Sequence, residues 1–232
     1  MEIEKSNKIA VVFGSTGLVG GHLIRLLCEN NSYARVVSYS RSPLTFSHKN
    51  LVSNVIPFKN LSAELKEMNG NDLFICLGTT IRKAGSKEKF RQIDKDYVVT
   101  IAKKAEYLGF NQVLLVSSVG ADKNSFFFYS RVKGEVEELL SKMDFWAIHI
   151  FQPSMLLGER NENRFGEKIA GIIGKGIDKI SGNLLKKYKP IEAEAVAAAM
   201  IQAANRMKSG TFTYLSHELQ DMSEAYYLEV GK

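Results

Sequence analysis

The chain has 232 residues, of which 45% are hydrophobic and 24% charged, and its formal net charge is +6. This length fits one α/β domain with a modest appendage and excludes two independent domains. The amino-terminal residues contain no apolar segment of the signal-peptide type, and no apolar run approaches the ~20 residues of a membrane-spanning helix. We therefore expect no membrane span and a cytoplasmic protein.

Strand-like and helix-like patterns alternate along the chain. The expected strands are residues 8–13, 35–40, 54–57, 72–77, 112–117 and 146–151. The expected helices are one beginning near residue 18, with Val19, Leu23, Leu26 and Leu27 on one face, and others at 86–108, 129–142 and 193–207. In the third of these, Val132, Val136, Leu139 and Leu140 are expected to face the sheet. This alternation predicts an α/β fold of the Rossmann type, a doubly wound parallel sheet with helices on both faces.

The pattern changes after Pro153. Residues 159–190 are irregular, spotted with glycine and rich in lysine. We therefore expect residues 1–153 to form a Rossmann core. Residues 154–232 are expected to form a small substrate-covering region integrated with that core as a single domain. Isoleucines of the basic stretch repeat near helical spacing at Ile169, Ile172, Ile173 and Ile177, which favours a lid or dimer face over a membrane-surface contact.

The charge and residue types of the chain limit which binding partners can be expected. The excess of lysine and arginine is interpreted either as a field that attracts a phosphorylated cofactor or acidic substrate, or, preferably, as a solvated surface. No DNA- or RNA-binding motif accompanies the charge, so no nucleic acid partner is expected. The four histidines and two cysteines show no ligand spacing, so no metal site is expected. Cys28 and Cys76 are interpreted as reduced core thiols, as in cytoplasmic proteins.

A glycine-rich loop follows the first expected strand directly. It reads Gly14-Ser15-Thr16-Gly17-Leu18-Val19-Gly20. The first glycine permits the strand-to-helix turn, the second lets a pyrophosphate approach the backbone, and the third lets the helix pack closely on the strand. The free amides of the helix start favour a phosphate there. A tight turn without a ligand is the less favoured interpretation.

The end of the second strand bears on the choice of nicotinamide cofactor. An NAD site usually places an acidic residue there, to accept a hydrogen bond from the ribose 2′-hydroxyl. Residues 37–42 contain no acid, whereas Arg41 can bind a 2′-phosphate, helped by Ser40 or Ser42. The sequence therefore predicts NADP(H) rather than NAD(H).

A tyrosine and a lysine four residues apart, Tyr129 and Lys133, share one face of the helix at 129–142. A phenol with an ordinary pKa of ~10 is a poor acid–base group at neutral pH, and a nearby ammonium stabilises its phenolate. Ser118 ends the fifth expected strand, where it can hydrogen-bond a substrate oxygen. The alternative is that Tyr129 is a core aromatic residue. The preceding phenylalanines at 126–128 are expected to pack as a wall near the site.

Several longer segments are more specific than these motifs. They are residues 13–17, 76–80, 83–85, 94–98, 117–123, 129–137, 152–157 and 159–160. With these segments the chain resembles the atypical short-chain dehydrogenases/reductases related to human Tat-interacting protein, over most of its length. Two positions depart from the wider superfamily: Asp94 stands where an asparagine is common, and residues 76–80 (Cys-Leu-Gly-Thr-Thr) replace Asn-Asn-Ala-Gly.

This resemblance implies NADPH bound in a Rossmann fold. The implied cofactor-binding residues are Gly14, Ser15, Thr16, Gly17, Leu18 and Val19 at the pyrophosphate, Arg41 at the 2′-phosphate, Leu77, Gly78 and Thr79 along the middle, and Tyr129, Lys133, Pro153 and Met155 at the nicotinamide. The implied catalytic residues are Tyr129, Lys133 and Ser118.

The favoured function is an NADPH-dependent oxidoreductase that transfers hydride to a small carbonyl substrate, with Tyr129 as acid/base. Two alternatives stay open: an NADPH-sensing regulatory protein with little or no catalysis that binds a protein partner, and a nucleotide-sugar epimerase or dehydratase. The sequence identifies no substrate, and both a monomer and a homodimer are compatible with it.

Overall fold

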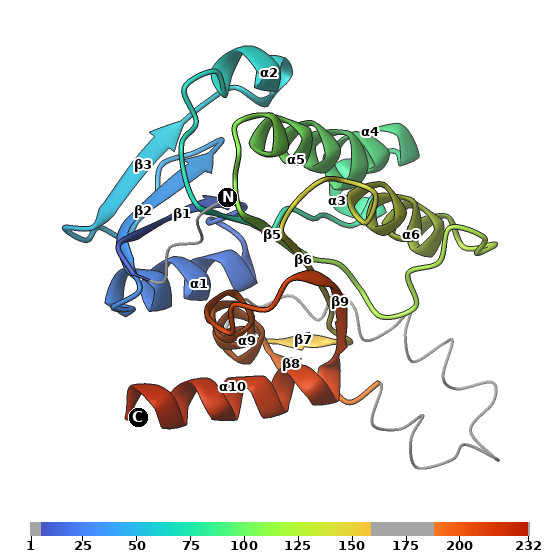
Figure 1. The fold of residues 1–232 in the computed structure, drawn as a ribbon. Helices are drawn as coiled ribbons and strands as arrows, with labels where there is room; N and C mark the ends of the chain where they lie inside the picture. Colours follow the sequence, from blue (N-terminus) through green and yellow to red (C-terminus); the bar gives the residue numbers. More distant parts are fainter. Residues whose placement is uncertain (1–5, 159–187, 232) are drawn as a thin grey trace.

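The computed structural model describes residues 6–158 and 188–231 (Figure 1). Its main sheet has seven strands in the order β3-β2-β1-β4-β5-β6-β9, and each adjacent pair is parallel. These strands are β1 (Lys8–Phe13), β2 (Tyr33–Ser40), β3 (Leu51–Val55), β4 (Asp72–Ile75), β5 (Gln112–Val116), β6 (Ala147–Gln152) and β9 (Gly210–Leu215). Two short strands, β7 (Leu156–Leu157) and β8 (Ile191–Glu192), pair separately.

The helices are α1 (Leu18–Glu29), α2 (Leu61–Glu64), α3 (Ile81–Ala84), α4 (Lys87–Arg91), α5 (Tyr97–Tyr107), α6 (Phe128–Leu140), α9 (Ala193–Asn205) and α10 (Ser216–Val230). A 3-10 turn at Phe58–Asn60 and a π-helix at Gln92–Asp96 complete the described elements. Figure 1 shows α2, α5 and α6 on one side of the sheet and α1 and α9 on the other, with α10 outside α9. The predicted doubly wound parallel sheet is therefore confirmed.

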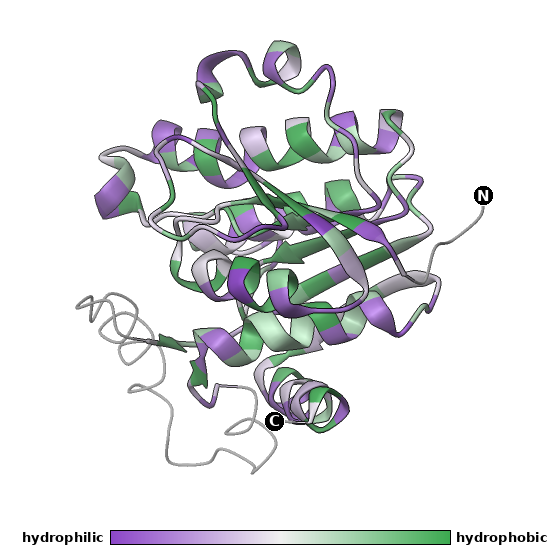
Figure 2. Ribbon diagram, turned by 90° about the vertical axis from the view of Figure 1, so that its left-hand side faces the viewer, coloured by the Kyte–Doolittle hydropathy of each residue, from purple (hydrophilic) through white to green (hydrophobic). Residues whose placement is uncertain are grey.

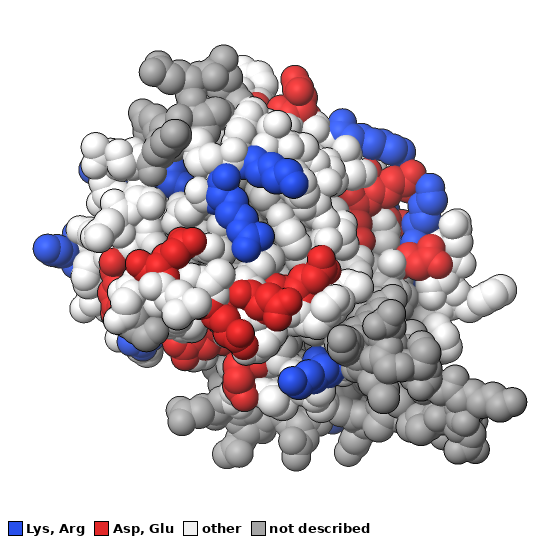
Figure 3. All heavy atoms as spheres, turned by 60° about the horizontal axis from the view of Figure 1, so that its bottom comes forward, with Lys and Arg blue, Asp and Glu red and all other residues white. Residues whose placement is uncertain are grey.

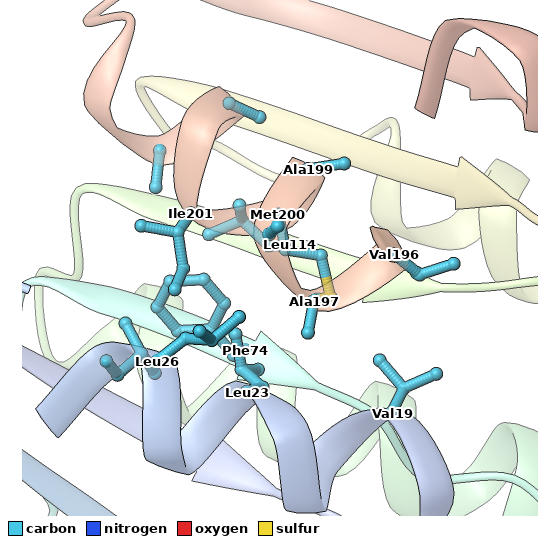
Figure 4. Packing of buried hydrophobic residues seen from close by; sticks show 14 of the residues in the cluster. Val19, Leu23, Leu26, Phe74, Leu114, Val196, Ala197, Ala199, Met200 and Ile201 are labelled. Carbon is cyan, nitrogen blue, oxygen red and sulfur yellow. The ribbon is translucent and has the colours of Figure 1, made fainter. Parts of the chain in front are cut away.

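Helix α9 is buried around most of its circumference because it lies between the sheet and α10. Figure 4 shows Met200 and Ile201 of α9 packed toward Leu23 of α1, with Phe74 of β4 and Leu114 of β5 alongside. Its many alanines allow this close approach, and a helix that is apolar all round belongs in such an interior. A second core cluster fills the opposite face of the sheet, under α5 and α6. Figure 2 shows hydrophobic residues concentrated on the strands.

Several expected elements differ from the observed ones. The strand expected at 54–57 is β3, which ends at Val55, and the single helix expected at 86–108 is divided by the π-helix into α4 and α5. Leu139 of α6 was expected to face the sheet, but its side chain is 37% exposed and does not. Strand β9 and helix α10 were not foreseen. Because β9 pairs with β6, the boundary drawn at residue 153 does not coincide with an end of the sheet.

The surface over the last two helices is acidic. Neither α9 nor α10 contains a lysine or arginine, and α10 contributes Glu218, Asp221, Glu224 and Glu229. On the face drawn in Figure 3, acidic side chains gather while basic ones are scattered. This face therefore does not carry the excess positive charge of the chain. The basic stretch at 168–187, together with Ile169, Ile172, Ile173 and Ile177, lies outside the described residues.

Candidate functional site

A cleft of about 230 Å³ opens at the carboxyl ends of the central strands. One bound water needs only about 10–15 Å³, so the cleft has room for a larger group. Ligands of open α/β sheets bind at this edge, where the strand order reverses, and here the reversal lies between β1 and β4. The lining residues are Gly17, Leu18, Val19, Cys76, Leu77, Gly78, Thr79, Thr80, Lys83, Asp94, Val116, Ser117, Ser118, Tyr129, Lys133, Pro153, Ser154, Leu156 and Gly158.

The glycine loop is fixed by backbone contacts. Gly14 has φ of +87°, and a Cβ there would lie 2.5 Å from the carbonyl carbon and oxygen of Cys76. A Cβ on Gly20 would lie 2.2 Å from the oxygen of Gly14, so both positions require glycine. The Ser15 and Ser38 hydroxyls, 2.5 Å apart, join the loop to β2. The strand-to-helix turn expected from the spacing is therefore present.

The start of α1 is suited to a phosphate group. The first helical hydrogen bond is donated by Gly21 to the oxygen of Gly17 at 3.0 Å, so the amides of residues 18–20 have no acceptor within the helix. Gly17 provides no side-chain cap, and the first turn contains no acidic residue. With Gly17, Leu18 and Val19 in the wall of the cleft, these amides fit the pyrophosphate of a dinucleotide.

Arg41 lies just beyond the end of β2 and is exposed. The Ser40 hydroxyl donates a hydrogen bond to the carbonyl oxygen of Ser42 at 2.6 Å, so Ser40 shapes this turn. Gly14, Ser15, Thr16, Arg41 and Met155 are the expected cofactor residues that do not line the cleft. The carbonyl of Met155 instead accepts a hydrogen bond from the amide of Ile191 at 3.0 Å.

Tyr129, Lys133 and Ser118 all line the cleft. The Tyr129 ring packs against Phe90 of α4 with 5.4 Å between ring centroids. The expected wall of three phenylalanines is wrong, because Phe126 is fully exposed and Phe127 is 64% exposed. Of the three, Phe128 packs inward, 5.9 Å from the Phe90 ring.

Lys133 is held by Asp94, a pairing that the sequence did not suggest. Its Nζ lies 2.9 Å from Oδ1 of Asp94, and the two side chains are 7% and 0% exposed. Burial alone would lower the pKa of Lys133, but the Asp94 carboxylate, with smaller effects of Tyr129 and Glu137, raises it above the ordinary lysine value. Burial raises the pKa of Asp94, and Lys133 and the Thr79 amide offset this only in part.

Glu137 is a further acid, half-buried, that the sequence analysis did not single out. It accepts hydrogen bonds from the Ser117 hydroxyl and, at 3.1 and 2.9 Å, from the Gln152 amide nitrogen. Burial raises its pKa, and these donors and Lys133 offset the effect only in part. Because it lies one turn beyond Lys133, the i, i+4 spacing that joins Tyr129 to Lys133 also leads to Glu137. This acid ties α6 to the ends of β5 and β6.

A parallel sheet in Rossmann order, a glycine loop at the start of α1 and a Tyr-x-x-x-Lys pair at the same edge define the class. It is the NAD(P)-binding short-chain dehydrogenase/reductase fold, in an atypical form because Asp94 and residues 76–80 depart from the usual pattern. Among curated proteins, the chain is 36% identical over 235 residues to protein HTATIP2 of Rattus norvegicus, covering 100% of this chain and 92% of that protein. The chain therefore belongs to the HTATIP2 family, as its motifs indicated. No family model matches the chain.

Other relatives correct one expectation. Protein FMP52, mitochondrial, of Saccharomyces cerevisiae is 32% identical over 200 residues, covering 84% of this chain and 86% of that protein. The Aspergillus niger protein of the same name is 31% identical over 232 residues, with coverages of 95% and 97%. The expectation of a cytoplasmic protein is contradicted by these names, which point to mitochondria.

Solved structures support the fold. The Helicobacter pylori ADP-L-glycero-D-manno-heptose-6-epimerase superposes with a TM-score of 0.68 at 14% identity, over 100% of this chain and 85% of that one. The Bordetella bronchiseptica enzyme WbmG, solved in complex with NAD, gives 0.67 at 11% identity, with coverages of 98% and 79%. Within residues 6–158 and 188–231, no helix has the length and apolarity needed to span a bilayer. The same residues contain no cluster of potential metal ligands.

Proposed function

We propose that the protein is an NADPH-dependent oxidoreductase that reduces a small carbonyl compound. One observation carries the proposal: Tyr129, Lys133 and Ser118 line the same cleft as the first turn of α1 and the Leu77-Gly78-Thr79 segment. The Tyr129 hydroxyl, which can act as an acid, the Lys133 ammonium and the Ser118 hydroxyl thus converge beside a helix start that suits a phosphate. This is the set of groups that proton-coupled carbonyl reduction requires.

The cofactor would be held by groups from three segments. The amides at residues 18–20 suit the pyrophosphate, and the exposed guanidinium of Arg41 suits a 2′-phosphate. Residues 37–42 provide no carboxylate to bind a ribose 2′-hydroxyl, which favours NADPH over NADH. When bound, the nicotinamide supplies the hydride.

The side chains of the cleft manage the proton. The Tyr129 hydroxyl would donate its proton to the carbonyl oxygen as charge develops there. Ser118 would donate a hydrogen bond to the same oxygen, because its hydroxyl makes only a long contact of 3.4 Å with the Val119 carbonyl. The ammonium of Lys133 would stabilise the tyrosine after proton loss and orient the nicotinamide ribose.

The test is Tyr129→Phe, assayed by NADPH oxidation against a panel of aldehydes and ketones. Loss of the proton donor should lower turnover by about 10²–10⁴-fold. The ring should keep its packing on Phe90, so NADPH affinity should stay within about threefold, or ~0.7 kcal/mol. Tyr107→Phe is the matched control, because Tyr107 is 82% exposed on α5 and outside the cleft. Undiminished turnover in Tyr129→Phe would remove the assignment.

A second candidate is an NADPH-sensing protein that binds a partner. The observation that favours it is the exposure of Phe126 and Phe127 immediately before α6, the helix that carries Tyr129 and Lys133. A surface aromatic pair next to a ligand site suits a cofactor-dependent contact. In that case the variant Phe126→Ser/Phe127→Ser should lose a partner that wild-type protein captures only with NADPH present. Capture that ignores both NADPH and the two substitutions would exclude this candidate.

A further inference from the structure

One carboxylate in the wall of the cleft makes contacts with two segments. Asp94 Oδ1 lies 2.9 Å from Nζ of Lys133 on α6. Its second oxygen, Oδ2, accepts a hydrogen bond of 2.9 Å from the amide of Thr79, in the loop between β4 and α3. Both segments line the cleft on which the proposed function rests.

We propose that Asp94 is a positioning residue that keeps Lys133 charged and directed at the cleft while it fixes the loop between β4 and α3 at Thr79. Its consequence for catalysis rests on the proposed function. The contacts themselves belong to the protein without any ligand.

The π-helix explains how Asp94 reaches this place. Residues Gln92–Asp96 form one wide turn between α4 and α5, and such turns are frequent at functional sites. This π-helix directs the Asp94 side chain inward, where it is fully buried. Asp96, two positions later, is exposed. A regular helix over this stretch would carry the side chains that follow about 100° further round the axis.

The surrounding charges make Asp94 the main counterion of Lys133. Arg91 and Lys95 both pair with Glu135, at 2.8 and 2.6 Å, so these cations are already engaged. Among the described residues, the other ionisable groups that act on Lys133 are Tyr129 and Glu137 on its own helix, and Lys83 lines the same cleft. Glu137 is occupied by Ser117 and Gln152.

The contact between Asp94 and Lys133 is mainly one of charge. Oδ1 of Asp94 accepts no hydrogen bond of regular geometry among the described residues, although Nζ is within 2.9 Å. Burial favours the neutral amine of Lys133, and the carboxylate reverses this preference. An asparagine at this position would still accept the Thr79 hydrogen bond, but it would leave the ammonium without its counterion.

Asp94→Asn therefore separates the two contacts, and Lys133 reports the outcome directly. We would label the ligand-free protein with an amine-acylating reagent across a pH series and quantify Lys133 by peptide mass spectrometry. The pH of half-maximal labelling should fall by at least about one unit in Asp94→Asn, because burial then dominates. At fixed pH below that midpoint, labelling should be about tenfold faster.

Two controls isolate the effect. Asp96→Asn removes the same charge from the same turn without touching Lys133, so it should leave the labelling curve of Lys133 unchanged. Lys142, 67% exposed on the segment after α6, is the internal reference in every sample. A uniform rise in labelling at all pH values would reflect opening of the fold, whereas a shifted midpoint reflects the lost counterion.

The outcomes separate the inference from the proposed function. An equal midpoint in wild type and Asp94→Asn overturns the inference, even if NADPH-dependent turnover is present. A shifted midpoint supports it, and turnover of Asp94→Asn should then decline above a lower pH than in wild type. If wild type shows no NADPH-dependent turnover while the labelling midpoint shifts, the proposed function fails, and the positioning of Lys133 by Asp94 is still supported.

Discussion

Two buried lysine–aspartate pairs lie at opposite ends of the same sheet. At the amino ends of the strands, Nζ of Lys8 is 2.8 Å from Asp72, and both side chains are 1% exposed. At the carboxyl ends, Lys133 and Asp94 are 2.9 Å apart and almost equally buried. Residue types, distance and burial are nearly the same, yet Lys133 and Asp94 line the cleft described above, whereas Lys8 and Asp72 do not.

The pairs differ in how completely their polar atoms are satisfied. Asp72 accepts hydrogen bonds from the Tyr33 hydroxyl at 2.5 Å and the Gln112 amide at 2.9 Å. Lys8 also donates to Tyr33 and to Asn205, at 3.1 and 3.0 Å. This network joins four strands, β1, β2, β4 and β5, to the end of α9.

The second pair is less fully bonded. Asp94 receives one amide hydrogen bond, from Thr79, and its Oδ1 lies 2.9 Å from Nζ of Lys133 without a hydrogen bond of regular geometry. Buried charges are tolerated when they are paired and hydrogen-bonded. Lys8 and Asp72 meet both conditions through contacts with other groups of the protein. The second pair retains bonding capacity at the edge of a cleft, which is where a ligand can use it. The two pairs therefore differ in how their carboxylates are hydrogen-bonded and in their position relative to the cleft, and not in burial.

Breaking the saturated pair should have the largest effect on stability. Asp72→Leu leaves Lys8 as an unpaired buried charge and should reduce the unfolding free energy by about 3–5 kcal/mol, measured by urea denaturation. The double variant Lys8→Met/Asp72→Leu should recover much of this loss, because no charge is then orphaned. If the single variant were as stable as wild type, the network would not support the fold as described.

A buried base, His149, has no carboxylate partner within the part of the chain that the structure describes. His149 of β6 stacks against both Phe212 and Tyr214 of β9, and burial lowers its pKa to about 4. The unfolded chain takes up a proton near pH 6.5, whereas the folded protein does so only near pH 4. His149 should therefore reduce stability as the pH falls from 6.5 to 4, by about 3 kcal/mol in total, with no loss above pH 6.5.

His149→Phe keeps the stacking and removes the titration, so it isolates this effect. Burial raises the pKa values of Asp94 and Glu137, and such acids stabilise the folded state as the pH falls, with the opposite sign. The difference between wild type and His149→Phe at each pH, from denaturant unfolding, gives the histidine contribution alone. A difference independent of pH would show that His149 does not titrate differently on folding.

The smallest expected effect concerns the choice of cofactor. Arg41→Ala should weaken NADPH binding by about 10–100-fold, because a charged hydrogen bond contributes roughly 1.5–3 kcal/mol. NADH binding should hardly change, so calorimetric titration of both cofactors should show their affinities converging. Arg35→Ala, at an exposed position near the other end of β2, is the control and should leave both affinities as in wild type.

Local patterns carried the parts of the fold that could be predicted. The glycine spacing of the loop predicted a turn that only glycine permits, as the φ of Gly14 shows. The i, i+4 spacing placed Tyr129 and Lys133 on one helix face, and both line the cleft. The alternation of strands and helices predicted the parallel sheet, because each element can be recognised from a pattern of about ten residues.

The parts that escaped prediction depend on distant or weak signals. No sequence pattern near Asp94 indicates a π-helix. None indicates Lys133 as the partner of Asp94 either, because that contact forms only when α6 packs on the π-helix. Strand β9, Gly210–Leu215, alternates threonine with aromatic residues, but it lies within residues 154–232, which were interpreted as a substrate-covering region and not as part of the sheet. Glu137 was hidden by its type, since glutamates on helices usually face solvent.

Cofactor binding is the claim on which the site, Arg41 and the catalytic groups all depend. The most direct measurement is thermal unfolding of purified protein titrated with NADPH and NADH in parallel, after unfolding a sample to check that no nucleotide is retained. At ~100 times the dissociation constant, a bound cofactor adds ~2.7 kcal/mol of stability. We predict a clear rise in the unfolding temperature with NADPH and little with NADH. An equal or larger shift with NADH, or no shift with either in nucleotide-free protein, would contradict the account.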